Sequence, residues 1–355
     1  MSEDADSAVA VLQERVRKAA QDGEGLAITG GDTKSFLGRV SRGTPCSVRT
    51  VQGVVHYEPT ELVVTVRAGT RLTELESTLA QSGQMLPFEP PAFGEGATIG
   101  GTIACGLSGP CRPYRGAARD FVLGVRCING KGESLRFGGE VMKNVAGYDV
   151  SRLMAGAMGT LGILTEISLK VLPRPACSQT RAFEMPGELA SELMTSFLGR
   201  SLPVSAAAYL DGVLWVRLSG SEAAVSTAAG ALGGDREAEG DAFWSQLKEH
   251  RLDFFSHDSP LWRISLKPQN DVIHFPGKTL IDWGGAQHWV KSDAGFEALS
   301  ELVRPYRGYV TGFGGRDQGV RSDVPQDAVL KLNRGLKAAF DPAGILNPGR
   351  LFPED

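Results

Sequence analysis

Hydrophobic positions in the first half of the chain come in short runs that are separated by glycine-rich loops. The runs are rich in β-branched residues and extend from Leu26 to about Pro173. This spacing is typical of many short strands rather than of long helices. We predict strands at residues 26–29, 54–57, 63–66, 122–128 and 163–171, and helices at residues 7–21 and 72–82.

Two prolines, Pro173 and Pro175, mark a change of pattern, because each proline biases the residue before it away from helix. Beyond them the glycine loops become fewer, and the alternation of runs predicts a β-α-β-β-α-β order followed by further strands. This order favours an antiparallel sheet backed by helices, a ferredoxin-like arrangement. The predicted strands are 180–185, 204–210, 213–218, 261–266, 278–283 and one near 309, and the predicted helices are 188–198, 222–232 and 296–303.

The last residues read as a short helix followed by two proline turns, which we expect to return to the first domain. The sequence therefore predicts an α+β protein in three parts. These are a first domain at 1–175, a smaller cap at 176–330 and a returning segment at 331–355.

Composition narrows the possible functions. The chain has 45 glycines among 355 residues, nearly double the usual share of about 7%, so the backbone must often turn tightly or approach a ligand closely. A net charge of −4 gives no reason to expect nucleic acid or an anionic membrane as a partner. Five scattered cysteines, an N-terminus unlike a secretory signal and the lack of an apolar run of about 18 residues predict a reduced, cytoplasmic chain.

The first glycine loop follows the predicted strand that ends at Thr29. Gly30 and Gly31 free the backbone to point several N–H groups at one anion, and the next residues, Asp32, Thr33 and Lys34, add polar and charged groups. This loop is a candidate phosphate site. A plain hairpin is the alternative interpretation, since short Gly-Gly turns are common.

The second glycine loop has six glycines between Gly94 and Gly109. This density favours a phosphate or ring lying against bare backbone. The spacing from Gly94 to Gly100 resembles the dinucleotide fingerprint, but Pro90 and Pro91 stand where its strand should be, so a Rossmann site is disfavoured. A P-loop is also disfavoured, because Gly130-Lys131 is followed by Gly132 rather than Ser or Thr.

The most specific motif is Lys143-Asn144-x-x-Gly147-Tyr148-Asp149, followed by a Gly-Thr-Leu-Gly-Ile-Leu-Thr-Glu run at 159–166. Together with the two glycine loops, the YEPTELVVTVRAGT run between them and the terminal FDPAGILNPGRLF, it resembles the vanillyl-alcohol-oxidase (p-cresol methylhydroxylase) family. The resemblance covers residues 26–175 and the last two dozen residues strongly, and the cap only weakly. It implies a two-subdomain FAD-binding PCMH-type domain with a cap.

The resemblance also implies where FAD binds. The two glycine loops would hold the pyrophosphate from either side, the 162–164 run would line the adenine and ribose end, and the 143–148 motif and Asn347 would lie toward the isoalloxazine ring. For Tyr148 and Ile163, core packing stays open as the alternative. The cofactor-binding candidates are Thr29, Gly30, Gly31, Asp32, Thr33, Lys34, Gly96, Thr98, Gly100, Gly101, Thr102, Gly106, Lys143, Asn144, Gly147, Tyr148, Gly159, Gly162, Ile163, Leu164 and Asn347.

Two departures from the family pattern matter. Members that bind FAD covalently through the first loop carry histidine after the glycine pair, whereas this chain has Asp32, so the resemblance implies non-covalent FAD. Relatives that oxidise 2-hydroxy acids carry a histidine-rich, metal-binding element in the cap. The five histidines here form no such element, and we predict no metal site.

Three phrases, SGPCRPYRGAARDFVLGVR, MKNVAGYD and LIDWGGAQHWV, resemble the smaller flavin subunit of three-part bacterial glycolate oxidases. The partners that this resemblance implies are a larger FAD-binding subunit and an iron–sulfur subunit, with a 2-hydroxy acid as the substrate and membrane contact at the inner face only through the complex. One alternative is a self-sufficient FAD-dependent 2-hydroxy-acid dehydrogenase with Arg263 as the carboxylate anchor. For Arg263, the open alternative is a surface residue paired with an acid. For the whole chain, a third alternative is a scaffold whose FAD is purely structural.

Overall fold

The computed structural model describes residues 2–139, 149–256, 259–269, 273–314 and 327–351. The chain divides into two compact units. Unit 1 comprises Met1–Leu107, Ala117–Pro173 and Val324–Asp355, and unit 2 comprises Ser108–Gly116 and Arg174–Asp323. Compact packing does not test independent folding, so separate domains at 1–175 and 176–330 stay a prediction.

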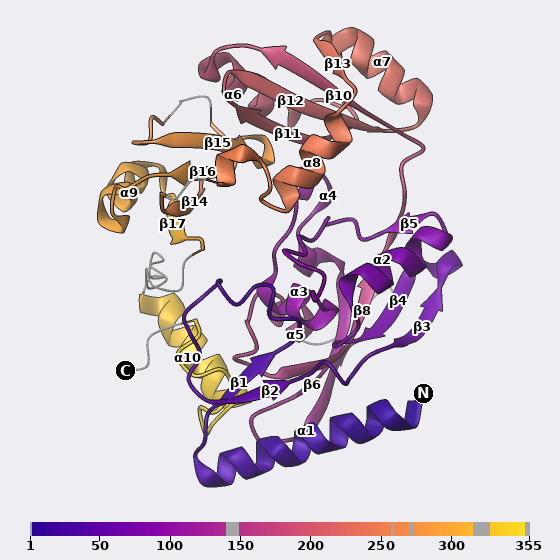
Figure 1. The fold of residues 1–355 in the computed structure, drawn as a ribbon, viewed down its shortest axis with the longest axis vertical. Helices are drawn as coiled ribbons and strands as arrows, with labels where there is room; N and C mark the ends of the chain where they lie inside the picture. Colours follow the sequence, from indigo (N-terminus) through magenta and orange to yellow (C-terminus); the bar gives the residue numbers. More distant parts are fainter. Residues whose placement is uncertain (1, 140–148, 257–258, 270–272, 315–326, 352–355) are drawn as a thin grey trace. The chain divides into compact units, whose positions relative to one another are not determined.

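Unit 1 is built on a five-stranded antiparallel sheet in the order β3-β4-β8-β6-β7 (Figure 1). Its central strands bury both faces, which explains why β4 reads Val-Val-Thr-Val without polar alternation. The strands of this sheet are β3 (Val54–Glu58), β4 (Val63–Arg67), β6 (Val122–Ile128), β7 (Ser134–Gly138) and β8 (Ile163–Lys170).

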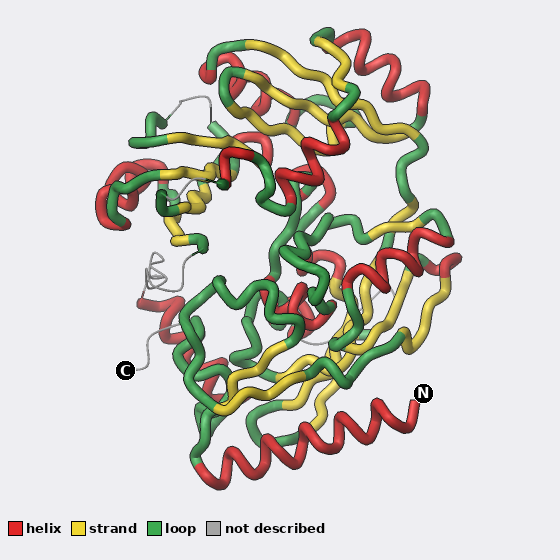
Figure 2. Tube along the Cα trace, in the orientation of Figure 1, coloured by secondary structure: helices red, strands yellow, loops and turns green. Residues whose placement is uncertain are grey.

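Helices and two smaller sheets complete unit 1, and long loops connect them (Figure 2). One core packs α2 and α3 against the five-stranded sheet through residues such as Leu75, Leu79 and Ile103. A second core packs α1 against the parallel pair β1-β2. The remaining α-helices and strands are α1 (Ser2–Asp22), β1 (Leu26–Thr29), β2 (Thr44–Ser47), α2 (Leu72–Gln81), β5 (Gln84–Met85), α3 (Ile99–Cys105), α5 (Val150–Leu153), β9 (Leu172–Pro173) and α10 (Asp327–Phe340).

The C-terminal segment belongs to unit 1. Leu346 forms a parallel bridge with Leu26 of β1, and Ile345 and Leu346 are buried in the same core as α1. Hydrogen bonds join the backbone of Leu26 to the carbonyl of Ile345 and the N–H of Asn347. The returning segment therefore fixes the strand that leads into the first glycine loop.

Unit 2 contains an eight-stranded antiparallel sheet in the order β13-β10-β12-β11-β15-β16-β14-β17. Its first half, β10-α6-β11-β12-α7-β13, has the strand order of a ferredoxin-like fold, which confirms that prediction. The elements of this half are β10 (Cys177–Glu184), α6 (Gly187–Phe197), β11 (Val204–Leu210), β12 (Val213–Gly220), α7 (Glu222–Leu232) and β13 (Asp235–Glu237).

The second half extends the sheet by four strands. The side chains of Trp262, Ile264, Val290 and Val310 face α9 and form a core with it, so their neighbours along each strand point to the opposite face. The elements are α8 (Gly240–Lys248), β14 (Leu261–Ser265), β15 (Lys278–Asp282), β16 (Gln287–Lys291), α9 (Phe296–Val303) and β17 (Tyr309–Gly312), and residues 108–116 contribute α4 (Arg112–Arg115). Among the helices that the structure describes, none is long and apolar enough to cross a membrane.

His288 is a buried polar residue in the covered face of the sheet. It lies in register between Ile264 and Ile281, its side chain is 8% exposed, and its Nδ1 has no hydrogen-bond partner among the described residues. Burial lowers the pKa of His288 to about 4, against a small upward effect of a hydrogen bond to the Gly285 backbone.

We expect His288 to make unit 2 sensitive to acid. Because the folded pKa lies below the unfolded value of about 6.5, the unfolded chain binds the proton first, so stability is complete above pH 6.5 and falls as the pH drops toward 4. The loss should be about 1.4 kcal/mol per pH unit. All five tryptophans lie in unit 2, so denaturant unfolding followed by tryptophan fluorescence at pH 7.5 and 5 measures it. In His288→Leu the free energy of unfolding should depend less on pH, by about 1.4 kcal/mol per pH unit. His56→Gln, an exposed position of unit 1, should leave this pH dependence unchanged. An unchanged pH dependence in His288→Leu would contradict the assignment to His288.

Candidate functional site

Two glycine loops of unit 1 cross at backbone contact distance. A β-carbon on Gly31 would lie 1.6 Å from the carbonyl oxygen of Gly96, and one on Gly30 would lie 2.3 Å from Thr98 Oγ1. Real β-carbons essentially never approach other atoms this closely, so both positions require glycine. The structure therefore brings together the two loops that the sequence singled out as phosphate loops.

The backbone of the first loop leaves several N–H groups unused. Arg49 donates from Nε to the Gly30 carbonyl at 2.8 Å and from Nη2 to the Gly31 carbonyl at 3.1 Å, which fixes where these carbonyls point. Asp32 has a left-handed backbone with φ of 59°, as in the turns that form anion-binding concavities. The N–H groups of Gly31, Asp32 and Thr33 donate to no residue that the structure describes.

Helix α3 begins in the second loop. Thr98 is its N-cap and accepts a hydrogen bond from the Gly101 N–H at 3.2 Å. A β-carbon on Gly101 would meet no other atom than Thr98 Oγ1. Thr102, one residue further on, is 1% exposed, and its hydroxyl has no partner among the described residues.

These features fit the pyrophosphate of a dinucleotide cofactor. Free N–H groups in a tight loop and an orphaned hydroxyl are donors that an anion accepts from, and the lack of a β-carbon at Gly101 leaves one side open. Only the Thr102 hydroxyl among these donors is buried, and because a buried donor without a partner is costly, it favours a ligand at this place. The N–H groups of residues 31–33 belong to half-buried or exposed residues and are accessible to the same ligand.

Other candidates in these loops have roles within the chain. Gly100 donates to the Ala68 carbonyl at 2.7 Å, and a β-carbon there would lie 2.8 Å from Ala68 Cβ. Gly106 ends α3 with a left-handed φ of 65°. The buried ammonium of Lys34 donates to the Ala92 carbonyl at 3.1 Å. These three residues thus have contacts within the chain, and their role in cofactor binding stays a prediction.

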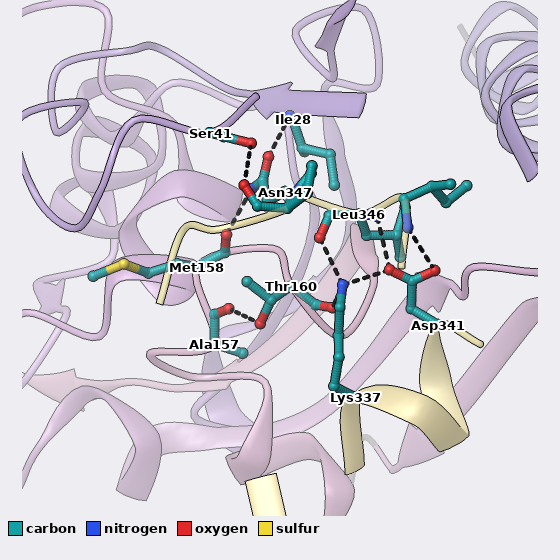
Figure 3. A network of polar contacts seen from close by, with 11 residues as sticks. Ile28, Ser41, Ala157, Met158, Thr160, Lys337, Asp341, Leu346 and Asn347 are labelled. Carbon is teal, nitrogen blue, oxygen red and sulfur yellow. Dashed lines mark hydrogen bonds and ion pairs between the residues drawn. The ribbon is translucent and has the colours of Figure 1, made fainter. Parts of the chain in front are cut away.

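Asn347 uses both ends of its amide within unit 1. Its Oδ1 accepts from the Ile28 N–H at 2.7 Å, and its Nδ2 donates to the Met158 carbonyl at 2.7 Å, as Figure 3 shows. A β-carbon on Gly159 would lie 2.7 Å from this Nδ2. Asn347 therefore joins the C-terminal turn to β1 and to the loop before β8.

The start of β8 is core rather than open surface. Ile163 is fully buried among α1 and β1 residues, and Leu164 is buried in the α2–α3 core. A β-carbon on Gly162 would lie 3.2 Å from the Ile128 carbonyl. The predicted ring-side candidates Lys143, Asn144, Gly147 and Tyr148 lie outside the described residues.

Arg263 lies in unit 2, on the face of β14 opposite α9. The side chain is half-buried, its Nε is buried without a partner, and no described acid forms an ion pair with it. Burial lowers the pKa of Arg263 to about 10, with a further contribution from the charge of Arg112. The alternative of a surface arginine requires an acid partner, and none is found among the residues that the structure describes.

Comparison with known proteins identifies the class. A family model described as an FAD binding domain matches residues 7–138. The chain is 48% identical to the glycolate oxidase subunit GlcE of Escherichia coli (strain K12), over 97% of both chains. The chain therefore belongs to the FAD-binding PCMH-type family, and FAD is its cofactor, which confirms the family and cofactor predictions.

The chain is also similar to a second glycolate oxidase subunit and to a solved structure of another enzyme. The glycolate oxidase subunit GlcD of Bacillus subtilis (strain 168) is 33% identical, over 85% of this chain and 78% of that protein. A solved alkyldihydroxyacetonephosphate synthase aligns with a TM-score of 0.67 at 18% identity, over 95% of this chain and 74% of the other. This second likeness concerns the fold, and it confirms the predicted fold class.

Sequence reasoning missed Arg49, which holds two carbonyls of the first glycine loop. Arg49 follows β2 without any motif, and only the parallel β1-β2 pairing brings it to the first loop. Arg112 was predicted as part of the first domain, although its segment packs in unit 2. Among the described residues, no three His, Cys, Asp or Glu side chains gather as metal ligands would.

Proposed function

We propose that this chain is the FAD-binding subunit of a glycolate oxidase complex and takes part in the oxidation of glycolate to glyoxylate. The observation that carries the proposal is the 48% identity, over 97% of both chains, to a glycolate oxidase subunit. The chain is an FAD-dependent oxidoreductase acting on the CH–OH group of 2-hydroxy acids, and electrons leave it toward an iron–sulfur subunit. Its other partner is the larger FAD-binding subunit.

In this proposal the crossing glycine loops hold the FAD pyrophosphate through the N–H groups of residues 31–33, with Gly101 and Thr102 on the other side. The free donors and the orphaned Thr102 hydroxyl support this assignment. FAD is bound without a covalent link, since Asp32 is no nucleophile toward the flavin. FAD supplies the acceptance of a hydride and the release of electrons one at a time. The placement of the 143–148 motif toward the isoalloxazine ring and of residues 162–164 toward the adenine stays a prediction.

The second candidate function is a self-sufficient 2-hydroxy-acid dehydrogenase. Arg263 favours it, because a guanidinium without an acid partner suits a substrate carboxylate. The nearby His250 is a poor proton acceptor, since burial, Arg263 and Lys291 lower the pKa of His250 to about 3, and an effective base has a pKa near the working pH. A weak base in unit 2 supports the need for partner subunits.

We expect the purified, FAD-loaded chain by itself to oxidise glycolate or lactate negligibly. Once both partner subunits are co-expressed, the complex should oxidise glycolate rapidly. Anaerobic dye reduction by glycolate measures this, with FAD content as the control for loading. Turnover of about one per second or faster by the chain alone would support the self-sufficient dehydrogenase, and Arg263→Ala should then remove the activity. An inactive complex of all three subunits would overturn the proposed function.

A further inference from the structure

Arg49 holds two peptide groups of the first glycine loop from one side. Its Nε donates to the Gly30 carbonyl at 2.8 Å, and its Nη2 donates to the Gly31 carbonyl at 3.1 Å. These two nitrogens lie on one edge of the planar guanidinium, and their N–H groups point in fixed directions. Two consecutive carbonyls of the loop therefore face the same side, toward Arg49.

The direction of these carbonyls determines the direction of two N–H groups. In a trans peptide the carbonyl of one residue and the N–H of the next lie in one plane and point in opposite directions. The N–H groups of Gly31 and Asp32 therefore point away from Arg49. They donate to no residue that the structure describes, and successive N–H groups on one side of a turn form an anion-binding concavity.

The two glycines cannot hold this orientation by themselves. The crossing of the loops requires that Gly30 and Gly31 have no β-carbon, but a residue without a β-carbon adopts positive and negative φ about equally readily. The peptide between them can therefore turn over at little cost, and a turned peptide presents a carbonyl oxygen to the anion in place of an N–H. A contact from outside the loop is needed to favour one orientation, and Arg49 makes this contact.

The backbone that carries Arg49 is itself fixed. The Val48 N–H donates to the Thr29 carbonyl at 2.9 Å, which continues the parallel pairing of β1 and β2. A β-carbon on Gly69 would lie 2.4 Å from the Val48 carbonyl oxygen and 2.9 Å from that of Arg49, so this turn packs closely against Gly69. The Arg49 side chain therefore starts from a defined place beside the first loop.

We propose that Arg49 is a positioning residue for FAD, whose guanidinium turns the N–H groups of Gly31 and Asp32 toward the pyrophosphate. The inference deepens the proposed function, because it rests on the place proposed there for the pyrophosphate, and Arg49 acts through the loop. Its charge also strengthens both N–H donors, since hydrogen bonds in a chain polarise one another.

Stepwise dilution of the FAD-loaded chain, with released FAD measured by its fluorescence, gives the dissociation constant that tests this role. Arg49→Ala should weaken FAD binding by about tenfold or more, because only the fraction of loops with correctly turned peptides binds. Arg49→Lys should recover part of the affinity, since lysine keeps the charge but lacks the fork that joins both carbonyls. Far-UV circular dichroism should show folded protein for both variants, because the two bonds lie at the surface.

A second measurement reports on the pyrophosphate itself. At saturating FAD, the phosphorus NMR signals of the bound pyrophosphate should move in Arg49→Ala and Arg49→Lys, because they depend on the donors around each phosphate. Arg15→Ala is the matched control, since Arg15 Nη2 also donates to a backbone carbonyl of unit 1, that of Pro45 at 2.6 Å, but outside the loop. This variant should keep the FAD affinity and the phosphorus signals of the wild type.

Wild-type FAD affinity in folded Arg49→Ala would overturn the inference, as would phosphorus signals that stay in place in both Arg49 variants. If Arg49→Ala keeps its FAD while Gly101→Val in the second loop loses it, the pyrophosphate site stands and only the role of Arg49 is wrong. If Arg49→Ala behaves as expected but the three-subunit complex does not oxidise glycolate, the role of Arg49 stands and the proposed function fails.

Discussion

Gly31→Ala should abolish FAD binding and destabilise unit 1 by more than about 4 kcal/mol, among the largest effects expected of one methyl group. The added β-carbon would lie 1.6 Å from the Gly96 carbonyl oxygen and 2.4 Å from its carbonyl carbon. Both atoms are backbone, so no side-chain rotation relieves the clash, and the loops must separate. Bound FAD per chain, measured after acid precipitation, and far-UV circular dichroism melting give the two effects.

Gly335→Ala is the matched control, since Gly335 lies within α10 of the same unit and a β-carbon there meets nothing within 4 Å. Alanine should be neutral or stabilise the helix by up to about 1 kcal/mol, with FAD binding unchanged. If Gly31→Ala keeps stoichiometric FAD, the crossing of the two loops is wrong.

The Gly101→Val variant distinguishes an effect on FAD binding from an effect on folding. A β-carbon at Gly101 would meet only Thr98 Oγ1, at 3.2 Å, so the variant should fold but lose FAD if the pyrophosphate lies against this backbone. Full FAD content in folded Gly101→Val would mean that the phosphate loops are misassigned.

In the wild type all FAD should appear in the acid supernatant, and flavin that stays with the precipitate would contradict non-covalent binding.

The sequence predicted best what depends on local pattern. The strands β1, β6 and β11 and the helix α7 have the predicted bounds, because β-branched runs between glycine turns, and the spacing of alanine and valine in α7, are read within one element. The order of elements in the cap was sufficient for the ferredoxin-like half, since that topology follows from chain order.

What the sequence did not predict depends on distant contacts. Helix α3 was read as a glycine loop, since two of its seven residues are glycines and glycine disfavours helix. Contact with Ala68 requires Gly100, and this contact is invisible before the strands assemble. The place of segment 108–116 in unit 2 likewise depends on a distant contact, the hydrogen bond from the Trp283 indole N–H to the Gly109 carbonyl, 174 positions away in the sequence.

Asn347 has contacts within unit 1 that the sequence did not predict. The resemblance implied a place near the flavin ring, whereas both polar ends of its side chain bond to Ile28 and Met158 in the structure. These bonds hold Asn347 against β1, which leads directly into Gly30 and Gly31, and its place near the flavin ring stays a prediction.

Asp341 is expected to be the residue on which attachment of the C-terminal segment depends most. Its side chain is fully buried, accepts from the N–H groups of Ile345 at 3.2 Å and Leu346 at 2.7 Å, and pairs with Lys337 (Figure 3). Asp341→Ala removes the acceptor of two buried N–H groups and leaves the Lys337 ammonium without its negative partner, although its bonds to the Thr160 and Leu346 carbonyls remain. The free energy of unfolding should fall by about 3–5 kcal/mol.

The losses of stability in three variants, compared with one another, show whether the buried Asp341 carboxylate is what holds the C-terminal turn. Lys337→Met should cost less than Asp341→Ala, because the Asp341 carboxylate keeps its two backbone donors, although the carbonyls of Thr160 and Leu346 lose the Lys337 ammonium. Lys331→Ala, an exposed position of the same helix, should change stability by less than about 0.5 kcal/mol. Urea unfolding followed by far-UV circular dichroism gives all three values. If Asp341→Ala costs no more than Lys331→Ala, the buried carboxylate does not hold the C-terminal turn, and its contacts with Ile345 and Leu346 contribute nothing measurable to stability.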